Sequence, residues 1–135
     1  MDVQAEYLRE VMDEIESALI DPRGLRAHQR RLAFLLSYGS VVLLETYLTK
    51  QNVFKSGAKI NHLWLKKKKE NVKIFISRQI TCSIESLQEL DDLLDMIFKI
   101  ETQRNHVAYG KLVSEETLKD VITLFLDLKK KVEHV

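Results

Sequence analysis

The sequence predicts an all-α protein, a four- to five-helix up-and-down bundle in a single domain over residues 1–135. Three observations favour this class. The 135 residues include only 4 Gly and 1 Pro, so the turn residues that a many-stranded protein needs are scarce. Leu, Lys, Glu and Ala, which favour helices, are frequent. Several segments also repeat apolar residues at the spacing of one helix face.

Two helices are predicted in the first 50 residues. The first covers about residues 3–20, with Asp2 as a candidate cap and the stretch Asp21-Pro22-Arg23-Gly24 as its stop. The second covers about residues 25–50 and is apolar on nearly every face from residue 32 to residue 48. A helix of this kind must be packed by several neighbours, so we expect it at the centre of the bundle.

The segment from residue 51 to residue 80 has a weaker pattern. Residues 51–59 are predicted to be a loop, followed by a helix through LWLKKKK and a break at Glu70-Asn71. The stretch VKIFI has strand propensity but no second strand candidate with which to pair, so it is interpreted as a short helix or turn.

Two more helices are predicted in the C-terminal third. One begins at Ser83 and Glu85, or at a capping box from Ser86 to Glu89, and ends at Gly110 as a left-handed cap. Its apolar stripe, continued along the helix, reaches Arg104, so this arginine should lie in line with the apolar face. The last helix begins at Ser114 and turns these residues inward: Leu118, Val121, Ile122, Phe125, Leu128 and Val132.

The composition also excludes several kinds of functional site. The single cysteine, Cys82, excludes an internal disulfide, and neither a Gly-rich phosphate loop nor an HExxH motif is present. We therefore expect no cofactor and no metal. The acidic N-terminus does not resemble a targeting peptide, and the nearly uncharged run 32–44 is shorter than the roughly 20 residues that span a bilayer. A cytoplasmic protein without a membrane partner is expected.

Positive charge collects in the middle of a chain whose formal net charge is +1. The basic residues form an arginine segment and a lysine run, namely Arg23, Arg26, Arg30 and Arg31, and Lys66, Lys67, Lys68 and Lys69. Such groups can attract a polyanion, although the acidic first helix could neutralise the arginines within the bundle. Four consecutive lysines cannot all pair internally, so Lys66 to Lys69 are predicted to bind a ligand.

The stretch RNHVAYG, residues 104–110, carries the strongest chemical pattern. Arginine offers two N–H bonds to a phosphate, and histidine exchanges a proton near neutral pH, so Arg104 and His106 could support metal-independent RNA cleavage. On one helix, however, Arg104 points about 200° from His106 and about 140° from Tyr109. Convergence therefore needs an unwound helix end or a second subunit.

Structural roles for the same residues stay open. Arg104 could pair with Glu101 or with a carboxylate of the first helix, and Asn105 could hydrogen-bond at the helix end. His106 could be an exposed or core histidine. Two further groups are predicted to be structural: the histidines His28 and His62, and the core aromatic residues Phe34, Tyr38 and Trp64.

RNHVAYG resembles the RNxxxH signature of HEPN domains (higher eukaryotes and prokaryotes nucleotide-binding), with Tyr109 at the position of the family's histidine. RLAFLLSYGSVVLLETYL is similar to the long central helix of that family, and INHL at residues 60–63 is similar to the short helix that follows. The resemblance implies a HEPN-like bundle that forms a twofold dimer, with both signature segments at a shared cleft.

Family members include metal-independent ribonuclease toxins and partners of minimal nucleotidyltransferases. By this resemblance Arg104 would hold the scissile phosphate and Asn105 would support the helix end or contact the ligand. Tyr109 can donate a hydrogen bond but is a poor base at neutral pH, and His106 could replace the missing histidine only across a dimer cleft.

We therefore expect a homodimer that binds RNA or a nucleotide in a toxin–antitoxin or minimal-nucleotidyltransferase pair, with weak or lost ribonuclease activity. A small nucleotidyltransferase is a further expected partner. The alternative is a non-catalytic interaction module that uses its basic surface.

Overall fold

The computed structural model describes residues 3–109 and 111–135, except the side chains at positions 105, 106, 108 and 109. The described part contains these α-helices: α1 (Val3–Ile20), α2 (Gln29–Lys50), α3 (Lys69–Ser77), α4 (Leu90–Tyr109) and α5 (Glu115–Glu133). It also contains short 3-10 helices: η1 (Leu25–His28), η2 (His62–Lys66) and η3 (Ile84–Ser86). No strand occurs in these residues beyond an isolated antiparallel bridge of Phe54 and Ile80. The all-α class is confirmed.

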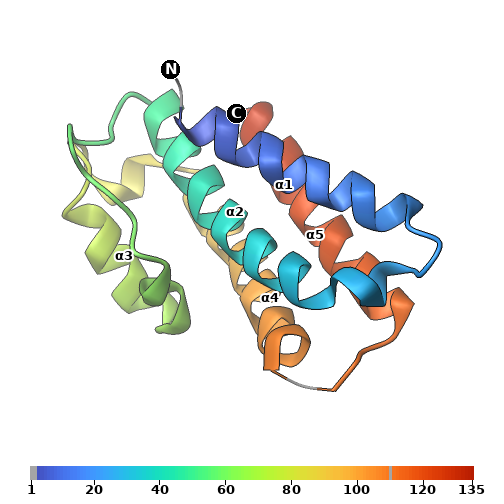
Figure 1. Ribbon diagram of the computed structural model, residues 1–135. Coiled ribbons are helices and arrows are strands. Elements are labelled where there is room, and N and C mark those ends of the chain that lie inside the picture. Colours follow the sequence, from blue (N-terminus) through green and yellow to red (C-terminus); the bar gives the residue numbers. More distant parts are fainter. Residues whose placement is uncertain (1–2, 110) are drawn as a thin grey trace.

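Helices α1, α2, α4 and α5 run alternately up and down as a four-helix bundle (Figure 1). α2 contacts α1, α4 and α5, as expected for the central helix. α3 and η2 lie to the side of the bundle, on the face formed by α2 and α4 (Figure 1). At one end α2 begins, α4 ends and α5 begins, so that end holds both the arginine segment and the signature segment at residues 104–110.

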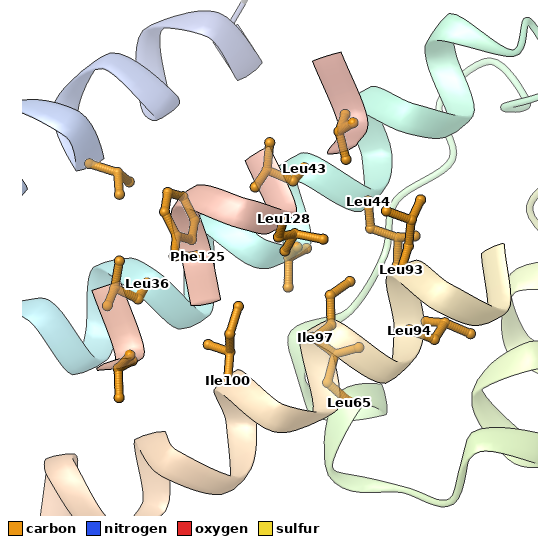
Figure 2. Packing of buried hydrophobic residues seen from close by; sticks show 14 of the residues in the cluster. Leu36, Leu43, Leu44, Leu65, Leu93, Leu94, Ile97, Ile100, Phe125 and Leu128 are labelled. Atoms are coloured by element: carbon orange, nitrogen blue, oxygen red, sulfur yellow. The ribbon is translucent and has the colours of Figure 1, made fainter. Parts of the chain in front are cut away.

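The core lies where α2, α4 and α5 meet (Figure 2). Burial of each Leu, Ile or Phe side chain of this core stabilises the fold by about 1.5–3 kcal/mol. Gly39 permits the close approach of α2 and α5, because an added Cβ would lie 2.7 Å from Cε1 of the buried Phe125 ring. Figure 2 labels the following core residues: Leu36, Leu43 and Leu44 of α2, Leu65 of η2, Leu93, Leu94, Ile97 and Ile100 of α4, and Phe125 and Leu128 of α5.

The stretch Leu25–Lys50 also meets the length and hydropathy criterion for a membrane-spanning helix. By length and composition its 26 residues, with a mean hydropathy of 1.5 in the most apolar window, could cross a bilayer. The buried core helix of a soluble protein passes the same test, and 67% of this window is buried inside the bundle.

Several predicted boundaries are confirmed. α1 covers the predicted range 3–20, and η1 with α2 covers 25–50. Ser114 caps α5 by accepting a hydrogen bond from the amide of Thr117, at 3.1 Å. The predicted inward residues of α5, from Leu118 to Val132, are all buried. The candidate caps Asp2 and Gly110 lie outside the described residues.

Two predicted boundaries are wrong. The break falls at Lys67 and Lys68 rather than at Glu70-Asn71, because α3 begins at Lys69 and Glu70 lies in its positive first turn. The stretch VKIFI belongs to this helix, as its interpretation as a short helix allowed.

The other wrong boundary is the start of α4. It begins at Leu90, because Ile84–Ser86 forms the 3-10 helix η3 and is followed by the buried Leu87. The hydroxyl of Ser86 donates to the carbonyl of Ser83 at 2.6 Å, so it does not cap a helix as predicted.

Candidate functional site

Arg104 lies near the end of α4 and is half-buried. Its Nε atom is buried, which agrees with its predicted position in line with the apolar face. One turn earlier the carboxylate of Glu101, itself buried, accepts a hydrogen bond from the hydroxyl of Ser37 on α2, at 2.5 Å. A polar pair therefore crosses from α2 to α4 immediately before the signature segment.

The side chains of Asn105, His106 and Tyr109 lie outside the described residues. Their backbone belongs to α4, which is helical through Tyr109. Positions 104 and 106 are therefore about 200° apart around the helix axis, without an unwound turn to bring them together. The roles predicted for these three residues stay predictions.

The start of α2 is joined to the end of α4 by Gln29, which is buried. Its Nε2 donates to the carbonyls of Val107, at 2.9 Å, and Lys111, at 3.3 Å. Its Oε1 accepts from the amide of Val113 at 3.1 Å. One side chain thus fixes the last turn of α4 and the connection to α5 against α2.

Glu115 makes a second link at this end. Its carboxylate accepts from the amides of Leu25, at 2.9 Å, and Arg26, at 3.1 Å, so it satisfies the first donors of η1. These backbone hydrogen bonds, that of Arg26 first, lower the pKa of Glu115 below its ordinary value. Gly24 is required beside it, because its φ is 87° and an added Cβ would lie 2.6 Å from Oε1 of Glu115.

A cavity of about 340 Å³ opens at the start of α2. The guanidinium of Arg26 is oriented by its Nε, which donates to the carbonyl of Val113 at 2.7 Å. Arg31 forms an ion pair with Glu14 of α1, in which its Nε lies 3.0 Å from Oε1 of Glu14. Its side chain is nevertheless 59% exposed. The lining residues are Arg26, Ala27, His28, Gln29, Arg30, Arg31, Lys111 and Leu112. We call this the arginine cavity.

Arg104 does not line the arginine cavity, but the two are connected. The carbonyl of Val107, three residues after Arg104, is bonded to Gln29, which lines the cavity. The fold therefore brings residues from the basic middle of the sequence next to the helix end that carries the signature segment.

His28 is buried between two carboxylates, in agreement with its predicted structural role. Its Nδ1 lies 2.7 Å from Oε1 of Glu14, and its Nε2 lies 2.8 Å from Oδ2 of Asp21. These hydrogen bonds, that of Glu14 first, raise the pKa of His28 above its ordinary value. The pKa of Asp21 is lowered, chiefly by its hydrogen bonds with Arg23 and then by that with His28. This pairing holds η1 against α1.

The lysine run lies elsewhere. Nζ of Lys69 is 2.9 Å from Oδ1 of Asp95 on α4, and this bond is the first cause of the raised pKa of Lys69. Lys66, Lys67 and Lys68 are exposed on η2 and on the link to α3. Asp95 precedes Arg104 by nine residues, or about 14 Å along α4, so the fold does not join this run to the signature segment.

The residues around Gln29 are the part of the site that the sequence reasoning missed. Arg26 and Arg30 are four residues apart, a spacing that puts side chains on one helix face and could have indicated a shared surface. Nothing in the sequence pattern indicated that Gln29 is buried or that Lys111 would join the arginines.

Metal-ligating side chains do not gather within the part of the chain that the structure describes: no group of three or more His, Cys, Asp or Glu residues there could hold an ion. Comparison with known proteins gives no matching family model, no similar curated protein and no similar solved structure. The likeness to HEPN domains is therefore a resemblance carried by residues of this sequence, with Arg104-Asn105 as its only specific motif.

Proposed function

We propose that this protein is a HEPN-like homodimer that binds RNA or a nucleotide at the end of the bundle where α4 stops. It acts in a toxin–antitoxin or minimal-nucleotidyltransferase pair, in which a small nucleotidyltransferase is the second protein. Its metal-independent ribonuclease activity is weak or lost, since Tyr109 stands where the family has its catalytic histidine.

One observation carries the proposal: the arginine cavity lies beside the helix end that bears Arg104. Its cationic residues are Arg26, Arg30, Arg31 and Lys111. Each guanidinium group can donate two N–H bonds to two oxygens of one phosphate. Several guanidinium groups together release counterions from a polyanion. Phosphate groups of a strand bound there would meet Arg104 and the arginine cavity together.

Catalysis would demand more than binding. Arg104 would hold the phosphate, and a general base would have to take a proton from a ribose hydroxyl. Tyr109 is a poor base because the ordinary pKa of a tyrosine is about 10. His106 would serve only if the partner subunit presented it to Arg104 across the twofold axis.

RNA binding in EDTA tests the proposal. Fluorescence anisotropy with a labelled single-stranded RNA should show affinity that falls steeply with salt, and Arg104→Ala should weaken it roughly tenfold or more. Lys99→Ala is the matched control, because it removes one exposed positive charge from the same helix. A gel of the same samples measures cleavage. Equal absence of cleavage and of salt-sensitive binding in the wild type and in Arg104→Ala would refute the proposal.

The dimer is tested separately by sedimentation velocity. The protein at micromolar concentration should sediment as a homodimer, and a monomer across that range would contradict the shared cleft.

A second candidate is an interaction module without catalysis. The exposed side chains of Lys66, Lys67 and Lys68 favour it, since adjacent lysines suit an acidic protein surface. A pull-down with the wild type and with the triple Lys→Ala variant should then recover an acidic protein only with the wild type. Recovery of nucleic acid without any protein would count against this candidate.

A further inference from the structure

Two large aromatic side chains of α2 face solvent, contrary to their prediction as core residues. Phe34 is 53% exposed and Tyr38 is 36% exposed. Both lie on α2 within the apolar run from residue 32 to residue 48, so this run is not buried on every side. Trp64, in contrast, is half-buried and packs on Phe75 at a ring distance of 5.2 Å.

These two exposed rings form a row with the half-buried rings of Tyr7 and His62, in which Tyr38 contacts each of the others. The centroid of Tyr38 lies 5.2 Å from that of Phe34, 5.5 Å from that of Tyr7 and 5.5 Å from that of His62. These distances are those of aromatic pairs in contact. The rings come from α1, α2 and η2, so the row bridges the bundle and the side element. We call it the aromatic row.

The aromatic row begins at the arginine cavity. Arg30, Phe34 and Tyr38 follow one another at intervals of four residues, which puts them on one stripe of α2 over about 12 Å. Arg30 lines the arginine cavity. A second cavity of about 270 Å³ lies at the other end and is lined by Tyr38, Val41, Lys59, Ile60, Asn61 and His62.

Cations at both ends and ring faces between them match the chemistry of a single nucleic-acid strand. Phosphates pair with cations, while unpaired bases stack on aromatic faces whatever their sequence. A duplex would keep its bases stacked inside and could not use the rings. Burial first, and then Tyr38 and Glu10 of α1, raise the pKa of the Tyr7 phenol above its ordinary value.

We propose that Phe34 and Tyr38 form a base-stacking platform for single-stranded RNA, continuous with the arginine cavity through Arg30. This inference rests on the proposed function and specifies its ligand as an unpaired strand. The aromatic residues supply affinity that depends on bases, and the arginines supply affinity that depends on phosphates.

Paired oligomers separate the two contributions. The wild type is titrated by anisotropy against a labelled adenosine oligoribonucleotide of about ten nucleotides, a length within known single-strand sites, and against an abasic ribose-phosphate oligomer of equal length. The same titrations are made with Phe34→Leu and Tyr38→Leu, which keep an apolar side chain but remove the ring face. Ile74→Ala on α3 is the control, because it removes an apolar side chain that is 49% exposed elsewhere.

Phe34→Leu should bind the adenosine oligomer roughly 5- to 30-fold more weakly, as expected for the loss of one stacked base. Its affinity for the abasic oligomer and its slope of log K against log salt should stay those of the wild type. Arg30→Gln should weaken binding of both oligomers and reduce that slope by roughly 0.7. Ile74→Ala should match the wild type.

Three results would overturn the platform. If the wild type binds both oligomers equally and Phe34→Leu changes neither, the rings do not stack on bases, although phosphate binding and the proposed function survive. If neither oligomer binds, both proposals fail. If Phe34→Leu converts a dimer into a monomer without RNA, measured by sedimentation, the aromatic row is an interface between two copies of this chain.

Discussion

Two parts of the chain are strongly basic: the arginine segment at residues 23–31, and a lysine segment at residues 66–73 that consists of the lysine run and its extension to Lys73. The fold uses the two segments differently. The arginines follow the turn between α1 and α2, where Gln29 and Glu115 fix the backbone by hydrogen bonds to the far end of the chain. The lysines lie on η2 and α3, beside the bundle, where Asp91 and Asp95 of α4 hold Lys73 and Lys69.

This difference shows that a charge run does not define a binding surface by itself. The arginine cavity has a fixed frame, in which Arg26 bonds to the carbonyl of Val113 and Arg31 to Glu14, so these two cations are oriented before a ligand arrives and less entropy is lost on binding. Lys66, Lys67 and Lys68 are exposed at the end of η2 and on the link to α3, where long side chains remain free to move. The predicted contact of the lysine run with a ligand stays a prediction, and we expect it to be the weaker of the two.

The largest effect is expected from breaking the frame itself. Gln29→Leu should lower the free energy of unfolding by about 2–4 kcal/mol, because it leaves the amide of Val113 and the carbonyl of Val107 without their buried partner. Urea denaturation measures the loss. Gln88→Leu, at an exposed position before α4, is the control and should change stability by less than about 0.5 kcal/mol. A loss below 1 kcal/mol in Gln29→Leu would mean that the frame is held by other contacts.

A pH titration tests the other support of the arginine segment. The pKa of His28 is raised by Glu14 and Asp21, so its protonated form favours the folded state. That contribution is complete below the ordinary pKa of about 6.5 and is lost as the pH rises through the raised value. The wild type should therefore lose about 1.5–3 kcal/mol of stability between neutral and alkaline pH, the range for hydrogen bonds to charged groups.

Two variants isolate this effect. His28→Leu should lose the alkaline dependence, whereas His134→Leu, at an exposed site after α5, should retain it. Glu14 gives the opposite pH dependence. Because its pKa is lowered, it contributes stability that is present above pH about 4.5 and is lost as the pH falls through the pKa of Glu14 in the folded state. Thermal melts across the pH range measure both limits. An unchanged alkaline slope in His28→Leu would exclude this histidine as its source.

RNA binding compares the two basic segments directly. Arg30→Gln and Lys67→Gln each remove one positive charge from an exposed position. We expect Arg30→Gln to weaken binding of single-stranded RNA about 3- to 10-fold, because a guanidinium that lines the arginine cavity is lost, and Lys67→Gln by less than about twofold. Anisotropy at constant ionic strength measures both. The reverse order would make the lysine run the main contact.

The smallest effect is expected from the lysine segment's own ion pair. Lys69→Ala should change stability by at most about 0.5 kcal/mol, because Lys69 and Asp95 are 32% and 56% exposed and water screens their attraction. Asp95→Ala should give the same result. A loss above 1.5 kcal/mol in either variant would show that α3 depends on this pair for its position.

Helical periodicity predicted most of the fold because each long helix buries a regular face. The inward residues of α5 and the range of α1 needed nothing beyond the spacing of apolar side chains. The segment between α2 and α4 was harder, since short 3-10 turns have too few residues to show a period. Ser86 matched a capping box in letters, but its hydroxyl bonds to Ser83 and the helix begins later.

The site was less predictable for a related reason. Phe34 and Tyr38 lie in an apolar run, so hydrophobicity assigned them to the core, although both side chains are exposed in the fold. Gln29 bonds to residues 78 to 84 positions later, and no local pattern encodes such a contact. The motif at Arg104 was recognised from the amino-acid sequence alone.

The hydrogen bond from the Val113 amide to Gln29 makes this loop residue a reporter of slow opening. Amides in exposed connections usually exchange with deuterium quickly, whereas this one is held by a buried side chain of another helix. Its exchange should require α2 to separate from the α4–α5 connection, so mass spectrometry of the peptide around residue 113 would follow that motion. A ligand that joins the two sides of the arginine cavity should slow it.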